Sequence, residues 1–245
     1  MSGQQIPRQL ALALDHAESF AREDFLSGPC NATALALVER WPDWPAPALA
    51  LVGPEGSGKS HLAAIWASIA GARFLAARAL AIALLPAALA TGALVVEDID
   101  PGQFDERALF HLLNLAREEG AFLLLTARTA PAGWKLAVPD LASRLKALPV
   151  AALTAPDDVL LRGVLVKLFA DRQLAVDESL IGFLTKRIER SIAAARGVVA
   201  ELDREAMRQQ RPLTRALAAE ILRLLPLTRN AGRVVKFPRA EAKDK

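Results

Sequence analysis

Short apolar runs alternate with amphipathic segments along the chain as far as Ala155. The runs are almost uninterrupted, which is typical of strands buried on both faces of a sheet. They predict strands at 48–52, 72–76, 93–100, 121–126 and 147–153. The other segments predict helices at 31–40, from His61 onward, and at 78–89, 105–119 and 139–145. Strand and helix alternating five times predict an α/β fold with a five-stranded, parallel, doubly wound sheet flanked by helices.

The pattern changes after Ala155, where helical periodicity continues without further strands. Helices are predicted at 158–171, capped by Asp157, at 178–187, capped by Asp177, and at 191–209 and 214–225. Together they predict a small helical bundle. Four regions follow from this pattern: a leader at 1–20, an α/β domain at 21–153, a helical domain at 154–228 and a tail at 229–245. The tail lacks apolar periodicity and is predicted to be disordered.

Composition narrows the class of protein without changing this picture. Apolar residues make up 53% of the 245 residues, enough to fill a core, and the absence of tyrosine favours helix-rich layers. A single cysteine, Cys30, excludes a disulfide framework and a cysteine-based zinc site. The start of the chain lacks the order of a signal peptide. Arg78, Pro86, Thr91 and Gly92 interrupt the apolar stretch 76–94, so we expect no membrane partner and a cytoplasmic location.

The net charge of +3 is unevenly placed along the chain. From Leu222 to Lys245 there are seven basic and two acidic residues, a charge of +5, which leaves −2 for the rest. A nearly neutral body with a short basic tail is not typical of a dedicated DNA-binding surface. The tail is either a contact to DNA or a solvated terminus.

The segment between the first predicted strand and the next helix has the pattern G-x-x-x-x-G-K-[ST]. It consists of Gly53, Pro54, Glu55, Gly56, Ser57, Gly58, Lys59 and Ser60, followed by His61. Glycines let consecutive backbone N–H groups surround phosphates, and the helix N-terminus adds a positive dipole. Lys59 is expected to reach the β- and γ-phosphates, and the Ser60 hydroxyl a Mg²⁺ ion. The alternative is a glycine-rich turn with a chance lysine.

Polar residues end two of the later strands. Glu97 and Asp98 lie in the carboxyl-terminal half of the third predicted strand, 93–100, and Thr126 ends the fourth, with Arg128 two residues later. Acids at the carboxyl end of such a strand can face metal-bound phosphates. The alternative is that the strand end is simply polar.

The chain resembles an AAA+ module with a helical lid. The features that carry this resemblance are the phosphate loop, the strand-end acids, the polar strand end, the later arginine and the helical domain. The run F-x-x-G-x-x-N at Phe25, Gly28 and Asn31, the strand 93–98 and the segment PDLASRL at 139–145 resemble the DnaA/Hda branch of that family. The resemblance covers about residues 20–228 and implies that ADP or ATP binds between α/β base and lid. It places Phe25, Asn31 and His61 among the nucleotide-binding residues.

The resemblance also implies roles for single residues. Glu97 stands where the family places a metal-binding aspartate, and Asp98 where it often places a water-activating glutamate. Compared with the family pattern, the side chain is one methylene longer at Glu97 and one methylene shorter at Asp98. These changes would impair ATP hydrolysis more than nucleotide binding. Thr126 matches a sensor of the terminal phosphate. Arg144 matches the arginine finger that enters a neighbouring subunit's site, although it could instead cap a short helix. Ala193 stands at the lid's sensor arginine, so Arg190 or Arg196 would have to substitute.

The leader has two interpretations. In an extended segment Leu10, Leu12 and Leu14 project to one side behind Gln9, which resembles the Q-L-x-L-x-L peptide that Hda-type proteins dock into the DNA polymerase sliding clamp. The alternative is a terminal helix or edge strand packed on the domain.

The resemblance implies a regulator that is tethered to a DNA-loaded clamp and presents Arg144 to ATP-bound DnaA, so that DNA is contacted through the clamp. A homo-oligomer is possible. Two other functions stay open: an adaptor or loader without effect on the initiator's ATP hydrolysis, and a self-sufficient ATPase or small-molecule kinase.

Overall fold

The computed structural model describes residues 20–224, which form two compact units. The sheet unit comprises residues 20–164 and Arg190–Ala193. The helical unit comprises Leu165–Glu189 and residues 194–224. The candidate clamp peptide at 9–14 and the predicted tail at 229–245 lie outside the described residues.

The sheet has five parallel strands, as the sequence predicted, and their order across the sheet is β2-β3-β4-β1-β5. Their bounds are β1 Ala48–Val52, β2 Arg73–Ala76, β3 Ala93–Ile99, β4 Phe122–Ala127 and β5 Val150–Ala152. β1 lies between β4 and β5, and every residue of β1 is buried. The carboxyl end of this interior strand therefore lies between the ends of β4 and β5.

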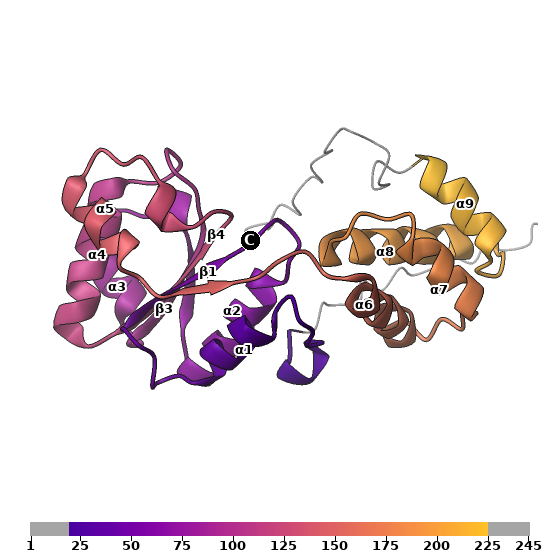
Figure 1. Ribbon diagram of the computed structural model, residues 1–245, viewed down its shortest axis with the longest axis horizontal. Helices are drawn as coiled ribbons and strands as arrows, with labels where there is room; N and C mark the ends of the chain where they lie inside the picture. The colour runs from indigo at the N-terminus through magenta and orange to yellow at the C-terminus, as the bar shows by residue number, and fades with distance from the viewer. Residues whose placement is uncertain (1–19, 225–245) are drawn as a thin grey trace, which may run out of the picture. The chain divides into compact units, whose positions relative to one another are not determined.

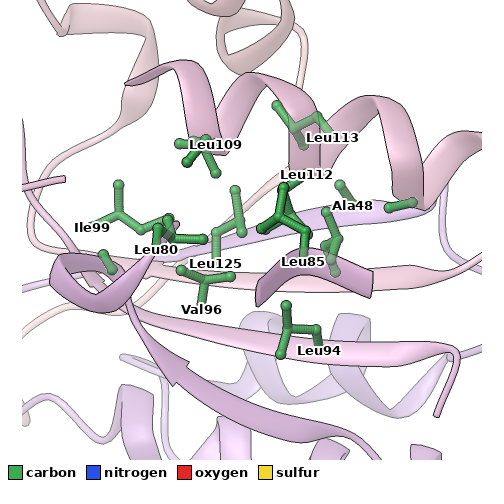
Figure 2. Close-up of a cluster of buried hydrophobic side chains, with 14 of the residues drawn as sticks. Ala48, Leu80, Leu85, Leu94, Val96, Ile99, Leu109, Leu112, Leu113 and Leu125 are labelled. Atoms are coloured by element: carbon green, nitrogen blue, oxygen red, sulfur yellow. The ribbon is translucent and has the colours of Figure 1, made fainter. Parts of the chain in front are cut away.

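Helices cover both faces of the sheet (Figure 1). Their bounds are α1 Ala32–Glu39, α2 Lys59–Ala70, α3 Leu85–Leu89, α4 Glu106–Glu119 and α5 Pro139–Lys146. One core cluster joins α3, α4 and α5 to the sheet; Figure 2 shows Leu109 and Leu112 of α4 facing Val96 and Leu125. The other joins α1 and α2 to the opposite face, around Trp66.

The helical elements after β5 are α6 Asp158–Asp171, α7 Glu178–Thr185, α8 Ile192–Gln209 and α9 Arg215–Leu224. All four begin within a residue or two of their predicted positions. Asp157 Oδ1 accepts the Leu160 N–H at 2.7 Å, and Asp177 Oδ1 accepts the Leu180 N–H at 2.9 Å. The predicted aspartate caps of α6 and α7 are therefore confirmed. The division between the two units falls within α6 and α8.

Two sequence predictions about local structure were wrong. The segment predicted as one helix at 78–89 contains 3₁₀ turns at Ala77–Ala79 and Ile82–Leu84, and then the short α3. Pro86 lies in the first turn of α3, where its missing N–H costs nothing, so it starts a helix there rather than continuing one. The last strand is shorter than predicted, because Ala147 still caps α5 with its N–H on Arg144 O.

No helix among residues 20–224 is both long and apolar enough to cross a membrane.

Candidate functional site

The phosphate loop, residues 53–58, joins the carboxyl end of β1 to α2. Gly53 donates its N–H to Ala127 O at 3.2 Å, so the loop starts against the end of β4. A Cβ added to Gly53 would lie 2.5 Å from Leu153 O. Any side chain at this position would push the loop away from the chain that follows β5, which explains why a glycine opens the loop.

The tip of the loop contacts the segment Arg190–Ala193, which is distant in sequence. Ile192 donates its N–H to Gly56 O at 2.8 Å. Gly56 has φ +71°, and an added Cβ would lie 2.1 Å from Ser191 Oγ and 2.9 Å from Ala193 Cβ. Gly56 therefore supplies both a left-handed turn and the space in which the start of α8 lies against the loop.

Lys59, the first residue of α2, points back into the loop. Its Nζ donates to Gly53 O at 2.7 Å and to Pro54 O at 2.8 Å. Burial lowers the pKa of Lys59, and the positive charge of Arg128 acts in the same direction, while Asp98 and Glu55 oppose it. Arg128 also forms an ion pair with Glu55 at 3.1 Å, with both side chains more than half exposed, 54% and 66%. The lysine thus lies among charges from the phosphate loop, from β3 and from the residue that follows β4.

The loop fits a phosphate group. Ser57 is only 2% exposed, and its Oγ has no hydrogen-bond partner in the described protein. A buried hydroxyl of this kind costs free energy unless a ligand or water completes it. Ser60 is exposed one position after Lys59, at the start of α2. The loop therefore brings a polar hydroxyl, glycine backbone and a cation to one place.

The two strand-end acids, Glu97 and Asp98, lie in a bulge of β3. Val96 pairs with Leu125 and Ile99 with Ala127, so both acids stand opposite the single residue Thr126. Asp98 has φ +55° and donates its N–H to Thr126 Oγ1 at 3.0 Å. A bulge redirects side chains relative to a regular strand. The charge of Asp98 raises the pKa of Lys59 and so opposes the effect of burial.

Phe25 and His61 pack together beside the loop. Their ring centroids are 5.2 Å apart in an edge-to-face arrangement, and His61 makes a second such contact with Phe20 at 5.4 Å. His61 Nε2 lies 3.0 Å from Ala21 O. The Phe25 ring also approaches Gly58, at 3.5 Å from the position of a Cβ. These rings join the segment 20–25 to the first turn of α2.

Asn31 is 1% exposed and holds the turn before α1. Its Oδ1 accepts the Gly28 N–H at 2.8 Å, and its Nδ2 donates to Leu26 O at 3.0 Å. Asn31 occupies the N-cap position of α1, but its side chain makes no hydrogen bond to the helix. The physical reason is that the preceding turn uses both ends of the amide.

Arg144 lies in the last turn of α5 and is partly exposed. Its guanidinium carbon lies 5.0 Å from the centre of the Phe110 ring on α4. A stacked guanidinium keeps the N–H groups at its edge available to an anion.

The two arginines considered as substitutes at the lid have different surroundings. Arg190 forms an ion pair with Asp158 at 2.9 Å. Arg196 belongs to the helical unit, on α8. Ala193, the predicted sensor position, is exposed and lies against the phosphate loop at Gly56.

At the level of sequence, no protein-family model and no curated protein matches this chain. Solved structures do match. Domain III of the replication initiation protein DnaA from Thermotoga maritima superposes with a TM-score of 0.70 at 18% identity, covering 83% of this chain and 95% of that one. This chain has the AAA+ fold.

Two further structures agree with this fold. AMPPCP-bound DnaA from Aquifex aeolicus has a TM-score of 0.63 at 16% identity, covering 75% of this chain and 65% of that one. The RuvB Holliday junction branch migration motor of Thermotoga maritima has a TM-score of 0.62 at 18% identity, covering 79% and 66%. At these identities the AAA+ likeness is one of fold.

Sequence reasoning missed the contact of Ser191 and Ile192 with the phosphate loop. It also missed the enclosure of His61 by two phenylalanines. No local signal marks either contact, because each joins residues more than 30 positions apart in the chain.

Proposed function

We propose that this chain binds ADP or ATP at the phosphate loop. The observation that carries the proposal is the loop itself: a glycine-lined turn between β1 and α2, with Lys59 at its end and a buried, unpartnered Ser57 hydroxyl. The AAA+ fold supports it, since the DnaA structure from Aquifex aeolicus is described as AMPPCP-bound. Bound phosphate oxygens would replace the loop carbonyls as the hydrogen-bond acceptors of the Lys59 ammonium group.

Mg²⁺ is part of this proposal. Residues 20–224 contain no group of three or more histidine, cysteine, aspartate or glutamate side chains that could hold a metal by themselves. The ion would therefore depend on phosphate oxygens, the Ser60 hydroxyl and one strand-end acid, Glu97 or Asp98. When bound, the ion neutralises phosphate charge, while Thr126 positions the Asp98 backbone.

We propose further that the chain is an Hda-like negative regulator of replication initiation. Gln9, Leu10, Leu12 and Leu14 would bind the sliding clamp, and Arg144 would enter the nucleotide site of ATP-bound DnaA. The position of Arg144 on an outer helix, with its guanidinium steadied by Phe110, supports this role. An arginine supplied from outside stabilises the charge that develops during phosphoryl transfer.

The test measures ATP hydrolysis by purified DnaA with DNA-loaded clamp. Wild-type protein is compared with Arg144→Ala, with a variant in which Gln9, Leu10 and Leu12 are alanine, and with Arg117→Ala as a control in the last turn of α4. We expect stimulation by wild type and by the control only. Equal stimulation by wild type and Arg144→Ala would rule out the finger.

An adaptor without catalytic effect is the second candidate. Arg190 is already paired with Asp158, and Ala193 carries no charge, so residues 190–193 offer the phosphate loop no unpaired cation. This arrangement favours nucleotide binding over turnover by the chain alone. Clamp binding with no change in DnaA hydrolysis would support the adaptor, whereas turnover without a partner would support a stand-alone ATPase.

A further inference from the structure

Two arginines of the helical unit are held over one phenylalanine ring. Phe183 lies on α7 and is 8% exposed. The guanidinium carbon of Arg187 lies 4.0 Å from the ring centre, and that of Arg215, the first residue of α9, lies 5.2 Å from it. The two carbons are therefore no farther apart than the sum of these distances. Both belong to the helical unit, so their arrangement is internal to it.

The charges of this pair are not neutralised as those of neighbouring arginines are. Arg172, Arg204, Arg208 and Arg211 each form an ion pair with a carboxylate. Within residues 20–224, neither Arg187 nor Arg215 is ion-paired with an acid. Glu189, two positions after Arg187, is exposed and not bonded to it. The helical unit thus has a local excess of positive charge at Phe183.

The ring determines how these cations can act. Stacking on an aromatic face holds a guanidinium in place while its N–H edge stays available for an acceptor. Two like charges around one ring repel each other, and an anion that both guanidinium groups contact would offset this repulsion. Phosphate matches this geometry, because guanidinium groups donate paired hydrogen bonds to its oxygens.

We propose that Arg187 and Arg215 form a phosphate-binding site for the backbone of a nucleic acid. A polyanion is favoured because the sequence from Leu222 to Lys245, which begins in the last turn of α9, has a charge of +5. The arginine pair would bind one phosphate, and the basic segment follows it in the sequence. This combination matches the repeated phosphates of a polyanion better than it matches a single small anion. The site is separate from the phosphate loop and does not rest on the proposed nucleotide binding.

The test uses the full chain and fluorescein-labelled single-stranded and duplex DNA, with anisotropy followed between about 50 and 200 mM salt. The variant is Arg187→Gln with Arg215→Gln. The matched control is Arg204→Gln with Arg208→Gln, which removes the same charge from ion-paired positions of the same unit.

For one or both DNA forms we expect the variant to bind about tenfold more weakly, with a salt slope smaller by about 1.4 to 1.8, the value for two phosphate contacts. The salt slope of the control should differ from the wild-type slope by less than about half of the value for one phosphate contact. Phe183→Leu keeps an apolar side chain but removes the ring face, and it should lose part of the affinity.

Three outcomes would overturn the proposal. Unchanged DNA binding by the variant excludes the site, and an equal loss in variant and control means that only net charge matters. Competition by inorganic triphosphate as strong per molecule as by DNA, measured in a Lys59→Ala background, would indicate a small-anion site. An oligoglutamate peptide that displaces DNA more strongly than unlabelled DNA does would indicate an acidic protein instead.

Discussion

At the scale of single residues, Lys59 is buried, although phosphate binding requires its positive charge. Burial lowers the pKa of its ammonium group, so it loses its proton at a lower pH than the 10.5 of an ordinary lysine. Protonated Lys59 is the form that attracts phosphate. The negative charges of Asp98 and Glu55 favour this form.

We therefore expect nucleotide affinity to fall as the pH rises toward 10.5, starting earlier than for an ordinary lysine. Titration of a fluorescent ADP analogue from neutral to alkaline pH measures this. Lys59→Arg is the control, since a guanidinium keeps its charge throughout and its affinity should change little with pH. Parallel profiles for the two proteins would contradict the assignment.

Ala193 is a residue at which a gain of function is expected. It is exposed and lies against the loop at Gly56, so Ala193→Arg has both space and proximity to reach a phosphate. A charge-assisted hydrogen bond contributes about 1.5 kcal/mol or more, which corresponds to about tenfold tighter binding. Calorimetric titration with ADP measures the gain. Ala193→Gln adds length without charge, and an equal gain there would argue against phosphate contact.

At the scale of elements, the bulge of β3 depends on Thr126 of β4. Thr126 is 2% exposed, and its hydroxyl accepts the N–H of Asp98, a residue held at positive φ. The bond fixes how the strand-end acids leave the sheet. A substitution of Thr126 in β4 should therefore alter the position of Asp98 in β3.

Thr126→Val keeps the side-chain shape but leaves the Asp98 N–H without its partner. We expect a loss of about 1–3 kcal/mol in the free energy of unfolding, measured by urea denaturation. Thr33→Val makes the same chemical change at an exposed position of α1 and should cost much less. If the two losses were equal, the hydroxyl at Thr126 would have no special role.

The contact between the phosphate loop and residues 190–193 can be tested with two glycines. Gly56 and Gly71 both have positive φ, +71° and +64°, but nothing lies within 4 Å of a Cβ added at Gly71. Gly56→Ala and Gly71→Ala should therefore share a backbone cost of about 1–2 kcal/mol. Only Gly56→Ala should also separate Ile192 from the loop and weaken ADP binding. Retained affinity in Gly56→Ala would contradict this coupling.

At the scale of the whole molecule, a ligand of the phosphate loop should stabilise the sheet unit. All four tryptophans, residues 41, 44, 66 and 134, lie in that unit, so tryptophan fluorescence follows its unfolding alone. ADP at about one hundred times its Kd should add about 2.7 kcal/mol to the free energy of unfolding. The Lys59→Ala variant should show no such increase, and an equal increase would place the ligand elsewhere.

The sequence was sufficient for the five parallel strands and for the phosphate loop. Buried strands are apolar along their whole length, and a phosphate loop is a contiguous segment with a fixed glycine and lysine spacing. Aspartates 157 and 177 also gave the starts of α6 and α7, since a cap bonds only three residues ahead. The segment 77–89 was predicted less well, because alanine and leucine suit both turns and helices.

The sequence by itself thus determined the layers of the sheet unit, its phosphate loop and the four helices that follow β5, all of which follow from local periodicity and short-range bonds. The tertiary structure alone decided which acid acts on Lys59, how Thr126 holds the β3 bulge, which residues meet Gly56 and which ring Arg187 and Arg215 share. Each of these depends on partners far apart in the chain, whose meeting is set by strand register and helix packing rather than by any pattern within one segment.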